Sequence, residues 1–154
     1  MLSLNHTQVT DAGLKALATL KTLEALDLCN TQVTDAGLKE LPEIKTLQSL
    51  CLDGTRVTNA GLKEPAALKE TLQTLHLGDT QVTNAGLKEL AALKSLQSLD
   101  LHGTQVNDAG VKDLVALKSL QFLTLTGTQL TDTGLKELRK GLPNCLVNWT
   151  LVAP

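Results

Sequence analysis

A single unit of about 24 residues is repeated along this chain of 154 residues. Segments that read T-Q-V-T-D-A-G-L-K, or close variants of it, place one glycine at the same point of every unit. These glycines follow one another at spacings of 24, 24, 25, 24 and 24 residues: Gly13, Gly37, Gly61, Gly86, Gly110 and Gly134. A fixed period of this length predicts an array of similar units, each of which buries its apolar side against its neighbours.

Each unit also contains the pattern L-x-x-L-x-L, as in Leu47, Leu50 and Leu52. The alternation L-x-L has the period of a strand, so both leucines point to one side and the residue between them to the other. We expect seven short parallel strands, at roughly residues 2–5, 25–29, 49–53, 74–78, 98–102, 122–126 and 146–150. Parallel strands need a crossover, and the rest of each unit is long enough to supply a short helix.

The start of each expected helix has a recognisable signal. In the second unit Thr34 is predicted to be the N-cap, Asp35 to favour the helix dipole, and Val33 to pack on Leu38 as a hydrophobic staple. The same six-residue pattern is found at residues 9–14, 57–62, 82–87, 106–111 and 130–135, with Asn107 as the N-cap of the fifth unit. Pro65 replaces a leucine of the other units and is expected to break or kink the third helix.

The combined unit, L-x-x-L-x-L-x-x-T-x-V-T-D-A-G-L-K, closely resembles the leucine-rich repeat over essentially the whole chain, and in particular its ribonuclease-inhibitor and F-box-associated type. The resemblance implies an α/β fold: a right-handed solenoid with a parallel concave sheet and short convex helices. Residues 1–154 would form one domain of about six repeats. Similar units with threonine at the ladder position are common in bacterial proteins of planctomycete type, which implies a bacterial source.

The two ends of the array differ in their sequence patterns. Leu2 and Leu4 occupy strand positions, so we expect no N-terminal cap and an open edge that allows self-association. Residues 142–154 are expected to be a C-terminal capping segment, with Trp149 lying over the last layer of the core. A structural spacer within a longer array is an alternative function for such a chain.

Composition and charge exclude several classes of protein. The chain is 42% hydrophobic and 19% charged but only 1% aromatic, so its core must be aliphatic. A net charge of −2 gives no support for binding to nucleic acid or to an anionic membrane surface. The sequence has no apolar stretch of about 20 residues and no pattern of a signal peptide.

The three cysteines do not suggest a disulfide framework. A bridge between Cys29 and Cys51 is expected to be absent, because diagonal positions on neighbouring strands lie roughly 8 Å apart. Reduced thiols and a cytoplasmic location are therefore the expectation.

The residues that point away from the core along the strands form the concave surface, where proteins of the resembling family usually bind other proteins. One column reads Ser3, Asp27, Cys51, His76, Asp100, Thr124 and Asn148; the next reads Asn5, Cys29, Asp53, Gly78, His102, Thr126 and Thr150; and a third adds His6, Asn30 and Asp79. These columns contain four aspartates and neither lysine nor arginine. Lysine instead recurs at two helix positions, which predicts a solvated convex face. An acidic concave face predicts a protein partner with a basic patch.

The candidate partner-binding residues are Asp27, Cys51, Asp53, His76, Asp79, Asp100, His102, Phe122 and Thr124. Phe122 is the one aromatic residue predicted to be exposed on the concave surface, and aromatic residues often anchor interfaces. The alternative for Phe122 is a ring that covers the edge of the core in the last repeats.

Cys51, His76 and Asp100 fall in one column on three successive strands. A thiol, an imidazole and a carboxylate in a row offer a nucleophile, a base and an orienting acid, or, with Cys29, Asp53 and His102, the ligands of a metal. An open sheet offers no oxyanion hole, and parallel side chains do not readily converge on one ion. The sequence therefore favours a non-enzymatic protein-interaction module with no cofactor, and the thiol or metal site is kept as an alternative.

Overall fold

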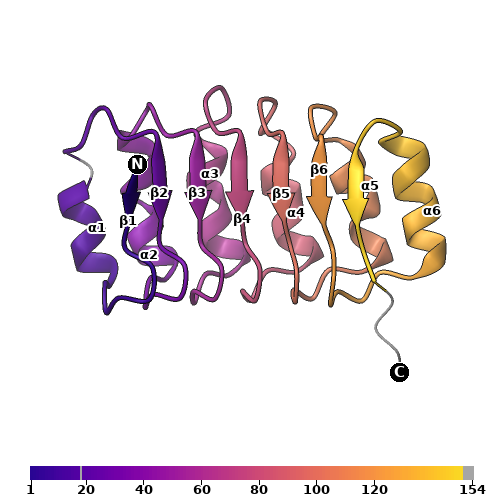
Figure 1. Ribbon diagram of the computed structural model, residues 1–154, viewed down its shortest axis with the longest axis horizontal. Coiled ribbons are helices and arrows are strands. Elements are labelled where there is room, and N and C mark those ends of the chain that lie inside the picture. Colours follow the sequence, from indigo (N-terminus) through magenta and orange to yellow (C-terminus); the bar gives the residue numbers. More distant parts are fainter. Residues whose placement is uncertain (18, 151–154) are drawn as a thin grey trace.

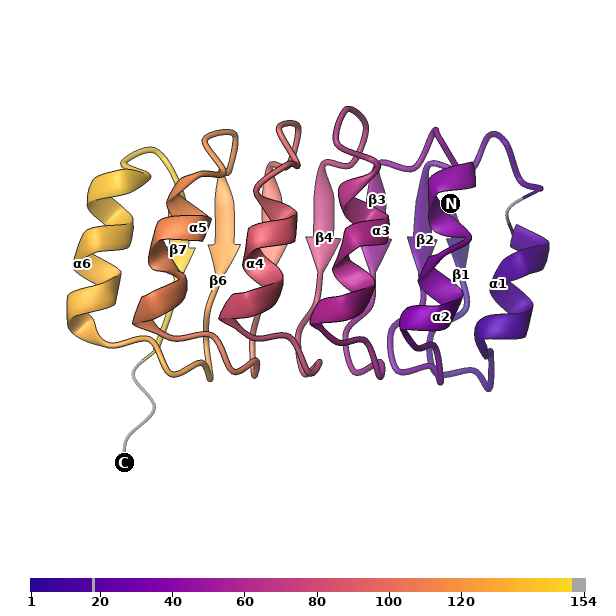
Figure 2. The same cartoon turned by 180° about the vertical axis from the view of Figure 1, so that it is seen from behind.

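The computed structural model describes residues 1–17 and 19–150, and these form two layers. One layer is a seven-stranded parallel sheet in the order β1-β2-β3-β4-β5-β6-β7, and short helices cover one face of it (Figures 1 and 2). The strands are β1 (Leu2–Ser3), β2 (Ala25–Asp27), β3 (Ser49–Cys51), β4 (Thr74–His76), β5 (Ser98–Asp100), β6 (Phe122–Thr124) and β7 (Leu146–Asn148). The α/β solenoid predicted from the repeat is thus confirmed.

The second layer contains α-helices and short 3-10 helices. The α-helices are α1 (Asp11–Leu17), α2 (Asp35–Leu38), α3 (Lys63–Ala66), α4 (Asn84–Leu90), α5 (Val111–Val115) and α6 (Asp132–Gly141). The 3-10 helices are η1 (Leu41–Glu43), η2 (Asn59–Leu62) and η3 (Asp108–Gly110). Figure 2 shows these helices side by side in front of the sheet, one helical segment per repeat.

The core lies between the two layers and is almost entirely leucine. Leu50 on β3 is in register with Leu26 on β2 and with Leu75 on β4, and Leu50 and Leu75 have no exposed surface. The same register continues through Leu99 and Leu123. Burial of one such leucine contributes about 1.5–3 kcal/mol of hydrophobic free energy. The side chain is fully covered only when both neighbouring repeats are present.

All seven strands are found where the sequence predicts them, but each is shorter than predicted. The chain turns soon after each strand, at a residue whose φ angle is positive in six successive repeats: His6, Asn30, Gly54, Asp79, Gly103 and Gly127. At φ angles of 51° and 54°, Asp79 and Asn30 are among the few non-glycine types that tolerate this conformation. The third of the expected concave columns is therefore a column of turn residues.

The predicted N-caps are confirmed in five repeats. The Thr34 hydroxyl accepts a hydrogen bond from the backbone N–H of Ala36 at 3.2 Å, and Thr58, Thr83, Asn107 and Thr131 also accept from backbone N–H groups at the starts of their helices. In the third repeat the helical segment is divided into η2 and α3, and Pro65 is buried within α3. The fifth repeat is divided in the same way into η3 and α5 without a proline, so Pro65 is not required for the division.

The buried threonine column closes turns within single repeats. Each hydroxyl donates to the carbonyl oxygen three residues earlier at 2.6–2.7 Å: Thr31, Thr55, Thr80, Thr104 and Thr128. None of these five hydrogen bonds crosses to another repeat. Backbone hydrogen bonds of the sheet connect the repeats on one side, and side chains at the helix starts connect them on the other.

The acidic or amide residue that follows each N-cap links its repeat to the next one. Asp35 accepts two hydrogen bonds from Thr58: its Oδ1 from the backbone N–H at 2.8 Å and its Oδ2 from the hydroxyl at 2.6 Å. Asp11 with Thr34 and Asp108 with Thr131 form the same pair. Asp35 was predicted only to favour the helix dipole, but its carboxylate also connects neighbouring helix starts.

The repeated glycine is explained by this connection. A Cβ atom at Gly86 would lie 2.6 Å from Oδ1 of Asn59, the residue that forms the link from the preceding repeat. Gly110 would meet Oδ1 of Asn84 at the same distance. Glycine therefore recurs in the sequence because the linking side chain of the preceding repeat occupies the space of a Cβ atom.

We expect each linked pair to need a hydrogen-bond donor on one side chain facing an acceptor on the other. Asn84 donates from Nδ2 to Oδ1 of Asn107 at 2.7 Å, and Asn107 Oδ1 also caps the N–H of Ala109. Asn84→Asp would place two acceptors against each other and should lower the free energy of unfolding by about 1–2 kcal/mol, measured by urea denaturation.

The combination Asn84→Asp with Asn107→Thr recreates the Asp35–Thr58 pair and should recover most of this loss. Asp35→Asn is the matched control, because Asn59 already donates to the Thr83 hydroxyl at 2.9 Å and shows that asparagine is accepted beside threonine. Equal stability of Asn84→Asp and the unsubstituted protein would contradict the matching.

At the C-terminal end, Trp149 packs against the core, and its Nε1 donates to the carbonyl oxygen of Leu130 at 3.2 Å. This contact agrees with the position predicted for Trp149. The assignment of residues 142–154 as a capping segment remains a prediction, and residues 151–154 lie outside the described residues. Self-association through the edge of β1 also stays a prediction.

Candidate functional site

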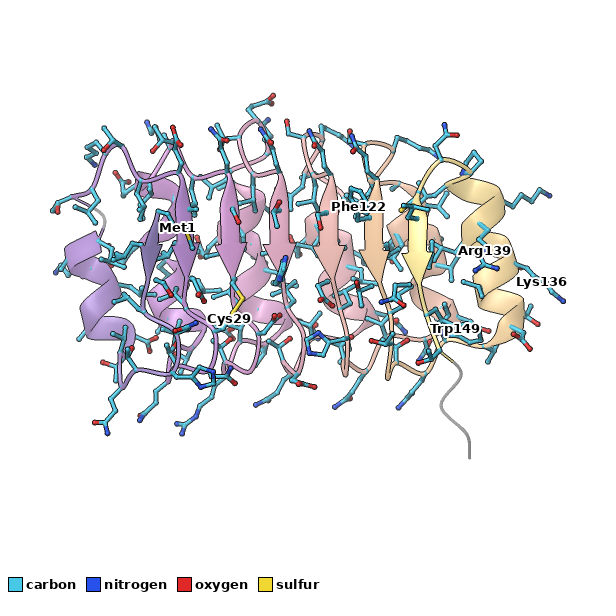
Figure 3. All side chains as sticks on the ribbon, in the orientation of Figure 1. Met1, Cys29, Phe122, Lys136, Arg139 and Trp149 are labelled. Atoms are coloured by element: carbon cyan, nitrogen blue, oxygen red, sulfur yellow. A yellow bond between two sulfur atoms is a disulfide. The ribbon has the colours of Figure 1, made fainter. Side chains whose placement is uncertain are left out.

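The face of the sheet opposite the helices, which we call the concave face, carries the predicted site residues, of which Phe122 is labelled in Figure 3. Strand register brings Asp27, Cys51, His76, Asp100 and Thr124 side by side in one row, as predicted. All five side chains are half-buried. Neighbouring side chains in this row nevertheless pair mostly with residues outside it.

Cys29 and Cys51 form a disulfide, and the expectation that they would not is wrong (Figure 3). Their Cα atoms are 5.6 Å apart, within the usual range for a bridge and well below the distance expected from strand geometry. The physical reason is that β2 ends at Asp27, so Cys29 already belongs to the turn and does not continue the extended strand. Cys145 is a free cysteine, and burial raises the pKa of its thiol.

The row Cys51, His76 and Asp100 does not form a nucleophile, base and acid in this structure. The Cys51 sulfur is bonded to Cys29, and its Sγ lies 3.5 Å from Oδ2 of Asp53. Nδ1 of His76 lies 3.7 Å from the same Asp53 oxygen, and Asp100 pairs with His102. The alternative of a row of three reacting groups is therefore contradicted, and the observed contacts join residues of the first column to residues of the second.

His102 lies between two carboxylates. Its Nδ1 is 3.0 Å from Oδ1 of Asp100, and its Nε2 is 3.3 Å from Oδ2 of Asp79. Gly78 makes room for this arrangement, because a Cβ atom at Gly78 would overlap the His102 ring. The free N–H of Gly78 donates to Oδ1 of Asp53 at 2.6 Å. Gly78 thus leaves room for the His102 ring of the next repeat and holds Asp53 of the preceding repeat through its backbone N–H.

The carboxylates raise the pKa of both histidines. For His76 the main cause is Asp53, and at 3.7 Å we attribute this to ion pairing rather than to a hydrogen bond; burial opposes it. For His102 burial lowers the pKa, but the hydrogen bond to Asp100 and the charges of Asp100, Asp53 and Asp79 outweigh that effect and leave the pKa raised. Both imidazoles are therefore protonated more readily than a free histidine.

We expect this cluster to make stability depend on pH. Because the folded pKa of each histidine lies above the unfolded value of about 6.5, the stabilisation is complete below that value and is lost as the pH rises through the folded pKa. Asp53→Asn should lower the pKa of His76 in an NMR titration of the imidazole protons and reduce the gain in stability on acidification. Glu43→Gln on η1 is the control, and an unchanged His76 titration in Asp53→Asn would contradict the assignment.

The C-terminal end of the concave face is apolar. Phe122 is 52% exposed, and it is in register with Leu146 on β7, which is 68% exposed. The exposure predicted for Phe122 is confirmed. Leu146 was missed, because the leucine pattern assigns only the core positions and Leu146 stands at a position where the other repeats have alanine, serine, threonine or Phe122.

Three groups of side chains bring possible metal ligands within 4.8 Å of one another on this face. The groups are Asp27 with Cys29 and Cys51; Cys51 with Asp53 and His76; and Asp53 with Asp100 and His102. In the first two groups the cysteine sulfurs are held in the disulfide, so they supply no thiolate in this state.

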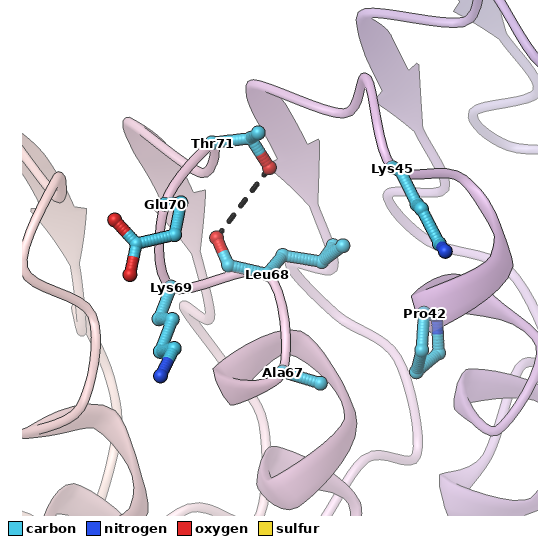
Figure 4. Close-up of a pocket in the computed structure, with 7 residues that line it drawn as sticks. All are labelled: Pro42, Lys45, Ala67, Leu68, Lys69, Glu70 and Thr71. Atoms are coloured by element: carbon cyan, nitrogen blue, oxygen red, sulfur yellow. Dashed lines mark hydrogen bonds between the residues drawn. The ribbon is translucent and has the colours of Figure 1, made fainter.

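A hollow lies on a different part of the molecule, beside the extra residue of the 25-residue unit. It is lined by Pro42, Lys45, Ala67, Leu68, Lys69, Glu70 and Thr71, and the Thr71 hydroxyl donates to the carbonyl oxygen of Leu68 at 3.5 Å (Figure 4). None of the predicted site residues lies in this hollow. Across the part of the chain that the structure describes, every helix is too short or too polar to cross a membrane.

Comparisons with known proteins agree with this architecture. The family model described as "Leucine Rich repeat" matches residues 2–18, 19–41, 69–91, 92–115 and 116–138. The unmatched residues 42–68 contain Cys51 and Pro65 but fold in the same way as the other repeats. No curated protein shows significant sequence similarity to the chain.

Among solved structures, the chain is similar to internalin C2 from Listeria monocytogenes. The TM-score is 0.54 and the sequence identity is 23%, and the match covers 97% of this chain and 80% of that one. At this identity the likeness concerns the fold. Because the family model matches more than half of the sequence, the chain belongs to the leucine-rich repeat family.

Proposed function

We propose that this protein is a non-enzymatic protein-binding module whose concave face takes a partner with a basic surface. Leucine-rich repeat proteins generally bind other proteins, which supports the general class of function. The observation that carries the specific proposal is the charge of the concave face: Asp27, Asp53, Asp79 and Asp100 lie in its columns without a lysine or arginine. Like-signed residues on one face steer a partner of opposite charge toward it.

The carboxylates are held in place before any partner arrives. Oδ2 of Asp27 accepts from the Ser3 hydroxyl at 2.8 Å, and its Oδ1 accepts from the N–H of Cys29 at 3.0 Å. Oδ1 of Asp100 accepts from the N–H of His102 at 2.9 Å. Side chains that are already ordered lose little conformational entropy on association, which favours binding.

The exposed pair Phe122 and Leu146 supplies the apolar contact that charges alone do not. Exposed aromatic side chains are common anchors of interfaces, and a leucine directly beside Phe122 enlarges the apolar area. The proposed interface therefore has two parts: carboxylates over β2 to β5 and an apolar end over β6 and β7.

The charge proposal predicts a defect in association. A peptide selected on the intact protein from a random display library should be rich in lysine and arginine. Asp27→Asn with Asp79→Asn should slow its association about tenfold at low salt, because steering is lost, and the difference should shrink at high salt. Asparagine keeps the hydrogen bond to Cys29 and tolerates the positive φ of residue 79.

Glu43→Gln with Glu137→Gln is the matched control, because it removes two charges from the helix side and should leave the association rate unchanged. Stopped-flow or biolayer measurements across a salt series distinguish the two variants. If both variants behave alike, the concave face is not the interface, and the role of a structural spacer becomes the better proposal.

The anchor role predicts a separate effect on affinity. Phe122→Ala should raise the dissociation constant for the same peptide roughly tenfold, or about 1.4 kcal/mol, with little change in the urea midpoint, because half of the ring is already exposed. Ser98→Ala changes the neighbouring position of the same row and should have little effect on affinity. A loss of stability without a loss of affinity would instead show that Phe122 covers the edge of the core.

A further inference from the structure

We propose that reduction of the Cys29–Cys51 disulfide opens a site for one zinc ion, held by both cysteines, His76 and Asp53. This site goes beyond the binding of a protein partner and involves a different state of the same face. The observation behind it is a juxtaposition: Cys51, Asp53 and His76 bring possible ligand atoms together at β3 and β4, and Cys29, which follows β2, is bonded to Cys51.

Asp53 is the centre of the arrangement. Its Oδ2 lies 3.5 Å from Sγ of Cys51 and 3.7 Å from Nδ1 of His76. The candidate ligand atoms of Cys51, Asp53 and His76 all lie within 4.8 Å of one another, and Cys29 brings its sulfur directly to Cys51. The four donors therefore come from three repeats and from two columns of the concave face, so they do not form the flat row that argued against a metal.

The separation of the two sulfur atoms can adapt to a tetrahedral zinc ion. With Zn–S bonds of about 2.3 Å, two thiolates on one zinc lie about 3.8 Å apart. The sulfurs of a disulfide are separated by about 2.05 Å, so side-chain rotation has to move them apart by less than about 2 Å. Two sulfurs, one nitrogen and one oxygen form a donor set that zinc accepts readily.

A second layer of contacts holds the donors. The other oxygen of Asp53, Oδ1, accepts from the backbone N–H of Gly78 at 2.6 Å, which leaves Oδ2 directed toward Cys51 and His76. The N–H of Cys29 is held by Oδ1 of Asp27 at 3.0 Å. Contacts of this kind orient metal ligands in proteins and increase the affinity for the ion.

The charge of the surroundings also favours a cation. The concave columns contain Asp27, Asp53, Asp79 and Asp100 but neither lysine nor arginine. Two thiolates formed beside these carboxylates would repel them unless a positive ion compensates. A dication bound at this point supplies that charge, whereas the neutral disulfide needs none.

A dithiol reductant delivers two electrons and two protons to the S–S bond, which breaks to give two thiols, while the reductant is oxidised to its own disulfide. Zinc then displaces the two thiol protons to the solvent as two Zn–S bonds form. In the reverse direction a small-molecule disulfide accepts two electrons from the two zinc-bound thiolates and two protons from the solvent and becomes a dithiol, which restores the Cys29–Cys51 bond and releases the ion.

The experiment compares zinc and cobalt binding by the oxidised and reduced protein, in a Cys145→Ser background that removes the third thiol. Reduction uses a phosphine, which is converted to its oxide with water as the oxygen source and does not compete for zinc as a dithiol does. Calorimetry should give one zinc per chain, bound roughly 100-fold more tightly after reduction than before. Cobalt should show a sulfur-to-metal charge-transfer band and the visible bands of a tetrahedral site.

Three variants assign the ligands. Cys29→Ser together with Cys51→Ser should abolish the charge-transfer band, and His76→Asn should weaken zinc binding roughly 10- to 100-fold while the band persists. His6→Asn is the matched control, because His6 belongs to none of the three groups of possible metal ligands and asparagine tolerates its positive φ angle, and it should bind zinc as the background protein does.

Equal zinc affinity before and after reduction, absence of the charge-transfer band, or wild-type binding by His76→Asn would each overturn the proposal. If reduction unfolds the chain, zinc must restore the native circular dichroism spectrum, and failure to restore it is equally decisive against the site. Peptide binding by the oxidised protein tests the proposed interface separately, so failure of one proposal leaves the other standing.

Discussion

Burial of leucine between successive repeats is the constraint from which the rest of the structure follows. Leu50 and Leu75 are fully buried because the repeat on each side of them supplies leucines at the same height. A single repeat has no means of covering these side chains by itself, so strand register cannot slip without exposing a whole layer. The concave side chains are therefore placed at fixed spacings by packing that takes place on the opposite face of the sheet.

The linking residues on the helix side work with this core. Each of them accepts a hydrogen bond from the backbone N–H of the N-cap residue in the next repeat, as Asp35 does from Thr58 at 2.8 Å. The linking side chain fits against the next repeat because the glycine there has no Cβ atom. Leucine packing sets the distance between repeats, whereas the hydrogen-bonded links and the glycines set the approach of their helices, and together they explain why both motifs recur with one period.

Periodicity made most of the fold predictable from the sequence. The positions of seven strands, five N-caps and the contact of Trp149 with the core all follow from patterns that repeat or end in a regular way. Strand ends were not predictable in this way, because they depend on a turn with a positive φ angle, which Asn30 and Asp79 adopt although they look like ordinary polar residues. The mistaken exclusion of the Cys29–Cys51 disulfide came from this error alone.

The candidate site was predicted as a set of residues but not as a set of contacts. His102 meets Asp100 and Asp79 because Gly78 leaves room for its ring, and His76 lies beside Asp53, whose other carboxylate oxygen accepts from the N–H of Gly78. Such contacts depend on the absence of a side chain at a neighbouring position, and a column of residue types does not reveal them.

The concave face has two regions of different character. The region over β2 to β5 contains a disulfide, carboxylates and two histidines whose charge depends on pH, whereas the exposed Phe122 and Leu146 carry no ionisable side chain. A partner that contacts both regions would be held by a constant apolar contact and released or retained by the ionised one.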